Sequence, residues 1–176
     1  MKNIKRIVIT GPPGSGKTTY INALKDKGFV IIEENAREII QEQLKKGSDA
    51  VPWKNVPKFS NLVLKERIRN FKKAREITFF DRGIPDIIAY LWVDKFDVAE
   101  RLNNAAKKYK YDNKVFVTQP WKKIYKKDSE RKESFEKSKL IFSKIKKCYK
   151  LYGYEIILLP RSKPEKVVCF ILESLD

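Results

Sequence analysis

The sequence predicts a three-layer α/β/α fold built around a five-stranded parallel sheet. Short apolar segments alternate with longer amphipathic segments along the chain, which is typical of a parallel sheet with helices on both faces. A glycine-rich turn at residues 11–18 joins the first apolar segment to the first amphipathic one. The 176 residues, 42% of them apolar, suffice for one domain with its own core over residues 1–176.

Five segments are predicted to be strands because they are short and rich in β-branched and aromatic residues. They span residues 5–10, 29–33, 77–81, 114–118 and 154–159. The expected order across the sheet is 2-3-1-4-5. In open sheets of this kind, ligands bind beyond the carboxyl ends of the strands, so we expect the functional site there.

Helices are predicted where apolar residues recur with a spacing of three or four. These segments are 19–27, 35–46, 58–74, 85–91, 97–109, 135–152 and 164–175. Residues 48–57 contain two prolines and one tryptophan and are predicted to form a loop. A lysine-rich excursion follows the fourth strand, and we expect a lid over about residues 119–132.

Residues 11–18 read G-P-P-G-S-G-K-T, which is an intact phosphate-binding loop. Its glycines allow successive backbone N–H groups to point at one oxyanion, and the helix that follows adds its dipole. In such loops the lysine, here Lys17, reaches the β- and γ-phosphates, and the hydroxyl of Thr18 ligates Mg²⁺. The motif therefore predicts a P-loop NTPase fold that binds a nucleoside triphosphate with Mg²⁺. The expected cofactor-binding residues are Pro13, Gly14, Ser15, Gly16, Lys17, Thr18 and Thr19. No N-K-x-D guanine motif is present, which favours ATP.

Two carboxylates at predicted strand ends are candidates for the chemistry. Asp81 ends an apolar strand, where it can hold the Mg²⁺ shell or accept a proton from the attacking hydroxyl. The next residue, Arg82, can clamp an anionic group of the acceptor. Glu34 follows the second strand as a general base or a binder of a sugar hydroxyl, and Arg37 lies one turn further on to bind the acceptor. The alternatives are a helix cap for Asp81 and a solvated helix start for Glu34.

Three further side chains are expected to contact ligands. Arg131, in the predicted lid, suits the spread charge of a transferring phosphoryl group because its guanidinium is planar. Trp53 can stack on a substrate base, or can instead pack its loop against the domain. Arg161 follows the fifth strand, where an adenine ring commonly rests in this fold. The alternative for the lid is a solvated basic turn.

Composition limits the function classes. Histidine is absent, so a general base must be Asp or Glu. The net charge of +17 is consistent with a nucleic-acid partner, but 30 of the 39 basic residues are lysines spread along the chain, which favours compositional bias. No apolar run is long enough to span a bilayer and none resembles a signal peptide. We therefore expect a cytoplasmic protein that does not bind membranes.

Several segments together resemble a family of small predicted AAA-type ATPases. They are residues 9–19, 34–40, 79–86, 128–135 and 159–161. The family is similar to the kinase domain that phosphorylates ribosylnicotinamide, and more loosely to nucleoside and thymidylate kinases. The resemblance implies that Gly14, Gly16, Lys17 and Thr18 bind ATP and Mg²⁺, that Asp81 and Arg82 form the Asp-Arg motif of nucleoside kinases, and that Arg131 is the lid arginine. The chain is too short for the extra helical domain of a full AAA machine, so ring assembly is not expected.

Together these features predict an ATP- and Mg²⁺-dependent phosphotransferase that acts on a small nucleoside- or nucleotide-like acceptor. Its catalytic residues would be Lys17, Asp81, Glu34 and Arg131. Two other hypotheses remain: a nucleotide-bound switch or regulator that works through a protein or nucleic-acid partner, and a kinase of polynucleotide ends.

Overall fold

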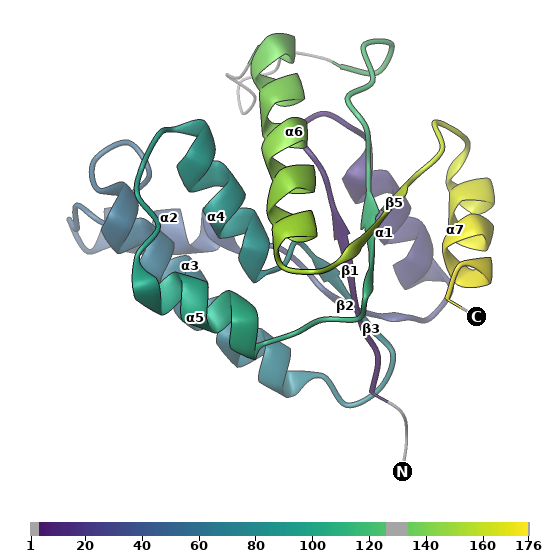
Figure 1. Cartoon of the computed structure of the whole chain (residues 1–176), viewed down its shortest axis with the longest axis horizontal. Coiled ribbons are helices and arrows are strands. Elements are labelled where there is room, and N and C mark those ends of the chain that lie inside the picture. Colours follow the sequence, from purple (N-terminus) through teal and green to yellow (C-terminus); the bar gives the residue numbers. More distant parts are fainter. Residues whose placement is uncertain (1–3, 126–133, 176) are drawn as a thin grey trace.

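The computed structural model describes residues 4–125 and 134–175 (Figure 1). Five parallel strands form one sheet in the order β2-β3-β1-β4-β5, which confirms the predicted fold class and strand order. The strands are β1 (Arg6–Thr10), β2 (Val30–Ile32), β3 (Thr78–Asp81), β4 (Lys114–Val117) and β5 (Glu155–Leu158).

Seven helices connect and cover the strands in the described parts of the chain. They are α1 (Lys17–Asp26), α2 (Ala36–Lys45), α3 (Val56–Lys73), α4 (Ile84–Val93), α5 (Glu100–Lys108), α6 (Phe135–Leu151) and α7 (Pro164–Glu173). Helix α3 begins earlier than the predicted residue 58, because the side chain of Asn55 caps the backbone N–H of Lys58 at 3.1 Å. Pro57 then falls in the first helical turn, where a missing N–H costs nothing.

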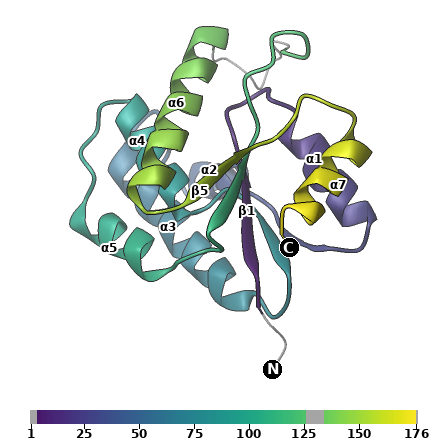
Figure 2. The same ribbon diagram turned by 45° about the vertical axis from the view of Figure 1, so that its right-hand side comes forward.

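The helices form one layer on each face of the sheet (Figures 1 and 2). Helices α1 and α7 lie on one face, over a core that includes Ile7, Ile9 and Phe116. Helices α3 to α6 pack on the other face, over a core that includes Val8 and Val115. Successive side chains of β1 therefore enter opposite cores, as the two-residue period of a strand requires. None of the described helices is both long and apolar enough to cross a membrane.

Strand β1 lies between β3 and β4, and this register positions the site. Ile9 pairs with Asp81 on β3, and Thr10 pairs with Val117 on β4. The carboxyl ends of these three strands therefore meet at one edge of the sheet. The loop that leaves β1 emerges beside Asp81 on one side and beside Thr118, the residue after β4, on the other.

Truncation of a buried leucine tests the larger core. Leu64 on α3 is fully buried, whereas Leu140 on α6 is 44% exposed, and both are interior helix positions. Leu64→Ala should lower the free energy of unfolding by about 2–5 kcal/mol, and Leu140→Ala by less than about 0.5 kcal/mol. Urea denaturation measures both values, and equal losses would contradict the packing of α3 against the sheet.

Candidate active site

The loop between β1 and α1 has the backbone that a phosphate-binding loop needs. Gly16 caps α1 in the left-handed region, with φ of 85°, which side chains other than glycine rarely adopt. Gly11 lies so close to the end of β4 that a Cβ atom there would be 1.9 Å from the Thr118 hydroxyl oxygen. The loop therefore depends on Gly16 for its left-handed backbone conformation and on Gly11 because no side chain fits beside Thr118.

Ser15 holds the middle of the loop. Its hydroxyl donates to the Pro12 carbonyl at 2.7 Å and lies 2.6 Å from the Thr118 hydroxyl, and the residue is buried. The Pro13 carbonyl accepts a hydrogen bond from Ser138 on α6 at 3.3 Å. Thr18 and Thr19 are exposed at the start of α1, so the Thr18 hydroxyl is accessible to an ion that arrives with a nucleotide.

Lys17 and Asp81 form an ion pair at the centre of the site. Their side chains are only 9% and 13% exposed. Burial lowers the pKa of Lys17 from its usual value and the nearby charge of Arg82 lowers it further, whereas the carboxylates of Asp81 and Glu34 oppose this shift. Burial penalises a charged amine, and the ion pair with Asp81 compensates part of this cost. Lys17 is therefore a poorly solvated cation beside the phosphate loop.

Glu34 and Arg82 form a second ion pair beside the first. The Arg82 Nε–H donates to a Glu34 oxygen at 2.9 Å, and one of the terminal guanidinium N–H groups donates to the Gly11 carbonyl at 2.9 Å. Arg82 is buried, and its φ of 71° is left-handed, a conformation that costs about 1–2 kcal/mol for a residue with a side chain. Such strain is concentrated at functional sites. Arg82 thus connects Glu34, which follows β2, to the phosphate loop.

The electrostatics keep Glu34 ionised. Burial alone would raise the pKa of its carboxyl, but the charges of Arg82, Arg67 and Lys17 outweigh burial and lower the pKa to about 2. Arg67 on α3 approaches the other carboxylate oxygen at 3.9 Å. At neutral pH Glu34 is therefore a stable anion that accepts hydrogen bonds.

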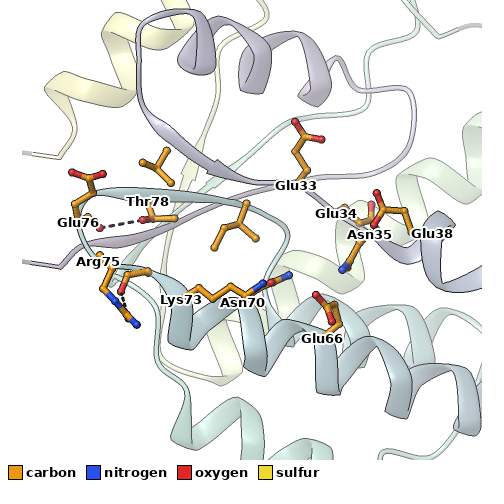
Figure 3. Close-up of a pocket in the computed structure, with 13 residues that line it drawn as sticks. Glu33, Glu34, Asn35, Glu38, Glu66, Asn70, Lys73, Arg75, Glu76 and Thr78 are labelled. Atoms are coloured by element: carbon orange, nitrogen blue, oxygen red, sulfur yellow. Dashed lines mark hydrogen bonds between the residues drawn. The ribbon is translucent and has the colours of Figure 1, made fainter.

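Glu34 also lines a groove of about 490 Å³ beside β2 and α3 (Figure 3). Glu34, Asn35 and Glu38 lie at one end of it, and Arg75 and Glu76 lie at the other. The groove runs from the carboxyl end of β2 to the start of β3 and is lined by polar groups from the segment after β2, from α2 and from α3.

The remaining predicted residues lie at the periphery. Arg37 is exposed in the first turn of α2, and Trp53 is 62% exposed in the loop between α2 and α3. Arg161 donates to the Pro120 carbonyl at 2.7 Å and helps to line a cavity of about 540 Å³ with Trp121 and Lys166. Arg131 lies outside the described residues, as do residues 126–132 of the expected lid.

Two residues of the site were missed by the analysis of the sequence. Arg67 lies within a predicted helix with no motif around it, so no local signal pointed to it. Thr118 ends a predicted strand that neighbours β1 in the predicted order, and its contact with the loop could have been inferred from that position.

The side chains present suit a magnesium ion that arrives with a nucleotide. No group of three His, Cys, Asp or Glu side chains is arranged to hold a metal within residues 4–125 and 134–175. Mg²⁺ is commonly held by one or two carboxylates together with substrate phosphates and water. The exposed hydroxyl of Thr18 and the carboxylate of Asp81 match that mode of binding.

Residues 6–166 match the family described as an AAA domain. The chain belongs to this AAA-domain family. A nucleotide-binding protein from Syntrophotalea carbinolica is 35% identical over 99 residues, which are 50% of this chain and 34% of that relative. The alignment with that relative therefore spans about a third of its length.

Solved structures of nucleoside and nucleotide kinases share the fold of this family member. A deoxyadenosine kinase from M. mycoides, with the products dCMP and dCDP bound, has a TM-score of 0.67 at 21% identity and covers 97% of this chain and 98% of its own. A thymidylate kinase from Ehrlichia chaffeensis has a TM-score of 0.64 at 16% identity, covering 98% and 100%. At these identities the likeness establishes a kinase-like P-loop fold.

The Glu34–Arg82 pair predicts a pH dependence of stability. A carboxyl group whose pKa is lowered on folding contributes stability above its unfolded pKa, near 4.5, and loses it as the pH falls toward 2. Glu34→Gln should therefore cost about 1–2 kcal/mol of unfolding free energy at pH 7, and this cost should shrink steadily below pH 4.5. Urea denaturation at several pH values measures it.

Glu38→Gln is the control, because Glu38 is an exposed carboxylate on the neighbouring helix. It should change stability little at any pH. A cost for Glu34→Gln that stays constant between pH 7 and pH 3 would contradict the charged pair.

Proposed function

We propose that this protein is an ATP- and Mg²⁺-dependent phosphotransferase of the nucleoside and nucleotide kinase type. One observation supports it above the others: the phosphate loop and two carboxylates from neighbouring strand ends are joined through Lys17 and Arg82. A site that only bound a nucleotide would not need the second carboxylate, Glu34, on the acceptor side. The acceptor is a small nucleoside- or nucleotide-like molecule with a free hydroxyl.

The loop and Lys17 would hold the triphosphate. Successive loop amides and the start of α1 favour phosphate oxygens, and the Lys17 ammonium is already held in the mouth of the loop by Asp81. When a nucleotide binds, Lys17 would exchange this carboxylate for the β- and γ-phosphates. Asp81 would then be free to act with Thr18 on the magnesium shell. Bound Mg²⁺ supplies neutralisation of the charge that develops on the phosphates.

Glu34 would orient the acceptor hydroxyl. A pKa of about 2 makes it a weak base at neutral pH. Phosphoryl transfer passes through a loose transition state, so its rate depends little on the strength of the base and strongly on how the reactants are positioned. Glu34 would therefore accept the hydrogen bond of the hydroxyl and take its proton late, and Asp81 is the alternative acceptor of that proton.

Charge balance explains the need for further cations. Lys17, Arg82 and Arg67 match Asp81, Glu34 and Asp86 in number, so this cluster is neutral before a nucleotide binds. A magnesium-bound triphosphate adds negative charge. We infer that Arg131, from the lid, closes over the phosphates to balance it, that Arg82 and Arg37 with Trp53 contact the acceptor, and that Arg161 contacts the adenine end.

Substitution of Lys17 tests the phosphate role. Lys17→Ala should lower kcat by at least about 100-fold, since it removes a preorganised cation from the transferring phosphates, while the far-ultraviolet circular dichroism stays unchanged. Lys147→Ala, at an exposed position of α6, is the control and should keep wild-type turnover. Full activity of Lys17→Ala would reject the proposed site.

The acceptor class follows from turnover of Mg-ATP by the purified protein, alone and with pools of nucleosides, nucleoside monophosphates, ribosylnicotinamide or a short oligonucleotide. Stimulation by one small-molecule pool supports the kinase and names its acceptor class. Transfer to the oligonucleotide would instead indicate a polynucleotide-end kinase. ADP formation that no pool changes would favour a nucleotide-dependent switch, in keeping with the nucleotide-binding relative.

Substitution of Asp81 tests the magnesium role. Asp81→Asn keeps the shape of the side chain but removes the charge that pairs with Lys17. The Mg²⁺ concentration for half-maximal turnover should rise by about tenfold or more, because one carboxylate of the metal shell is lost. A titration of turnover with Mg²⁺ measures this, and an unchanged midpoint would exclude Asp81 from the metal site.

A further inference from the structure

Asp86 is a fully buried carboxylate to which the proposed mechanism assigns no task. It lies in the first turn of α4 with 0% exposure. One oxygen accepts hydrogen bonds from the backbone N–H of Gly83 at 2.8 Å and from the Tyr149 hydroxyl at 2.5 Å. The other oxygen accepts the hydroxyl of Thr10. Its contacts therefore reach the end of β1, the turn after β3 and helix α6.

The charge of Asp86 is balanced by the arginines that hold Glu34. Arg82 approaches Asp86 at 3.6 Å, and Arg67 approaches it at 3.9 Å. The same two side chains reach Glu34 at 2.9 Å and 3.9 Å. Each arginine thus lies between Asp86, which is fully buried, and Glu34, which lines the groove. Removal of one partner of a buried ion pair is strongly destabilising, because it leaves an uncompensated charge.

The backbone of the turn depends on the same group. Gly83 also points its N–H at the Tyr149 hydroxyl at 3.1 Å, and a Cβ there would meet that oxygen at 2.7 Å. Arg82, the residue before it, has the left-handed φ of 71° and donates its N–H to the Ile9 carbonyl at 3.0 Å. Asp86 and Tyr149 therefore support the turn from which the Arg82 side chain projects.

We propose that Asp86 and Tyr149 are positioning residues that hold Arg82, and through it Glu34, in the orientation that phosphoryl transfer needs. This inference rests on the proposed phosphotransferase function. Both residues are fully buried and neither lines the groove, so the proposal gives neither of them a contact with a ligand. Their effect is transmitted through Arg82, which touches the Gly11 carbonyl as well as Glu34.

The decisive comparison is between two buried tyrosines. Tyr149→Phe removes only the hydroxyl that reaches Asp86. Tyr154→Phe is the matched control, because Tyr154 is 6% exposed, its ring lies 5.4 Å from that of Tyr149, and its hydroxyl accepts the Tyr111 N–H at 3.2 Å. Both substitutions remove one buried hydroxyl, but only one of the hydroxyls is bonded to Asp86.

Both variants should lower the midpoint of urea unfolding. Only Tyr149→Phe should lower kcat, by about 10- to 100-fold, while the KM for ATP stays within about threefold, as expected when positioning is lost and ground-state binding is kept. Asp86→Asn should also lower kcat. The double variant Tyr149→Phe/Asp86→Asn should have a kcat little lower than that of Asp86→Asn alone, because both substitutions disrupt the same contact. Equal kcat for Tyr149→Phe and Tyr154→Phe would overturn the proposal.

A second readout does not depend on activity. The Arg82 Nε–H, assigned in the ¹⁵N spectrum by its loss in Arg82→Lys, should exchange slowly with water because it is buried and bonded to Glu34. Tyr149→Phe should shift this resonance and speed its exchange, and Tyr154→Phe should not. An unchanged resonance in Tyr149→Phe would reject the positioning role. If the wild type transfers phosphate to no acceptor, the proposed function fails, yet this comparison still decides how Arg82 is held.

Discussion

The site is built on the pairing of β1 between β3 and β4. This register sets Ile9 opposite Asp81 and leaves the phosphate loop to emerge between Asp81 and Thr118. Gly11 has no room for a side chain because Thr118 lies against it. A slip of β1 by one residue would exchange the side chains between the two cores and move Lys17 away from its partner Asp81. The packing of both helical layers therefore also fixes the geometry of the functional groups.

Electrostatics impose a second constraint on the same edge. Charges withdrawn from water are costly unless they are paired and hydrogen-bonded. The site arranges three cations and three anions so that each has a neighbour of opposite sign, and Glu34, 31% exposed, is the most accessible of them. Arg82 is central, since it contacts Glu34, Asp86 and the Gly11 carbonyl. The pKa of Glu34, lowered to about 2, is a consequence of this arrangement. A nucleotide would enter a cluster that is already neutral, which makes additional cations necessary.

The fold and the family establish a P-loop domain, but they do not by themselves establish its reaction or its substrate. P-loop folds serve many reactions, and function depends on the groups placed around the loop. Here the distinctive groups are a carboxylate after β2 and an arginine held between two carboxylates. The proposal of a kinase, as opposed to a protein that only binds a nucleotide, rests on these two groups. The groove beside Glu34 has polar groups from the segment after β2, from α2 and from α3.

The strand order, the phosphate loop and the candidate residues Lys17, Asp81, Glu34 and Arg82 could all be predicted from the sequence, because the segment types and motifs behind them can be recognised locally. A loop motif, an apolar run that ends in a carboxylate, and alternating segment types are all readable within a few residues. Ser15 was identified only as a loop residue, whereas its contact with Thr118 spans 103 positions of the chain. Only the tertiary structure showed that Arg67 and Asp86 share the charge of Glu34 and Arg82, or that Tyr149 supports the turn after β3. These contacts join helices that are distant in sequence, and their partners are chosen by packing and by the need to neutralise buried charge, which no local pattern records.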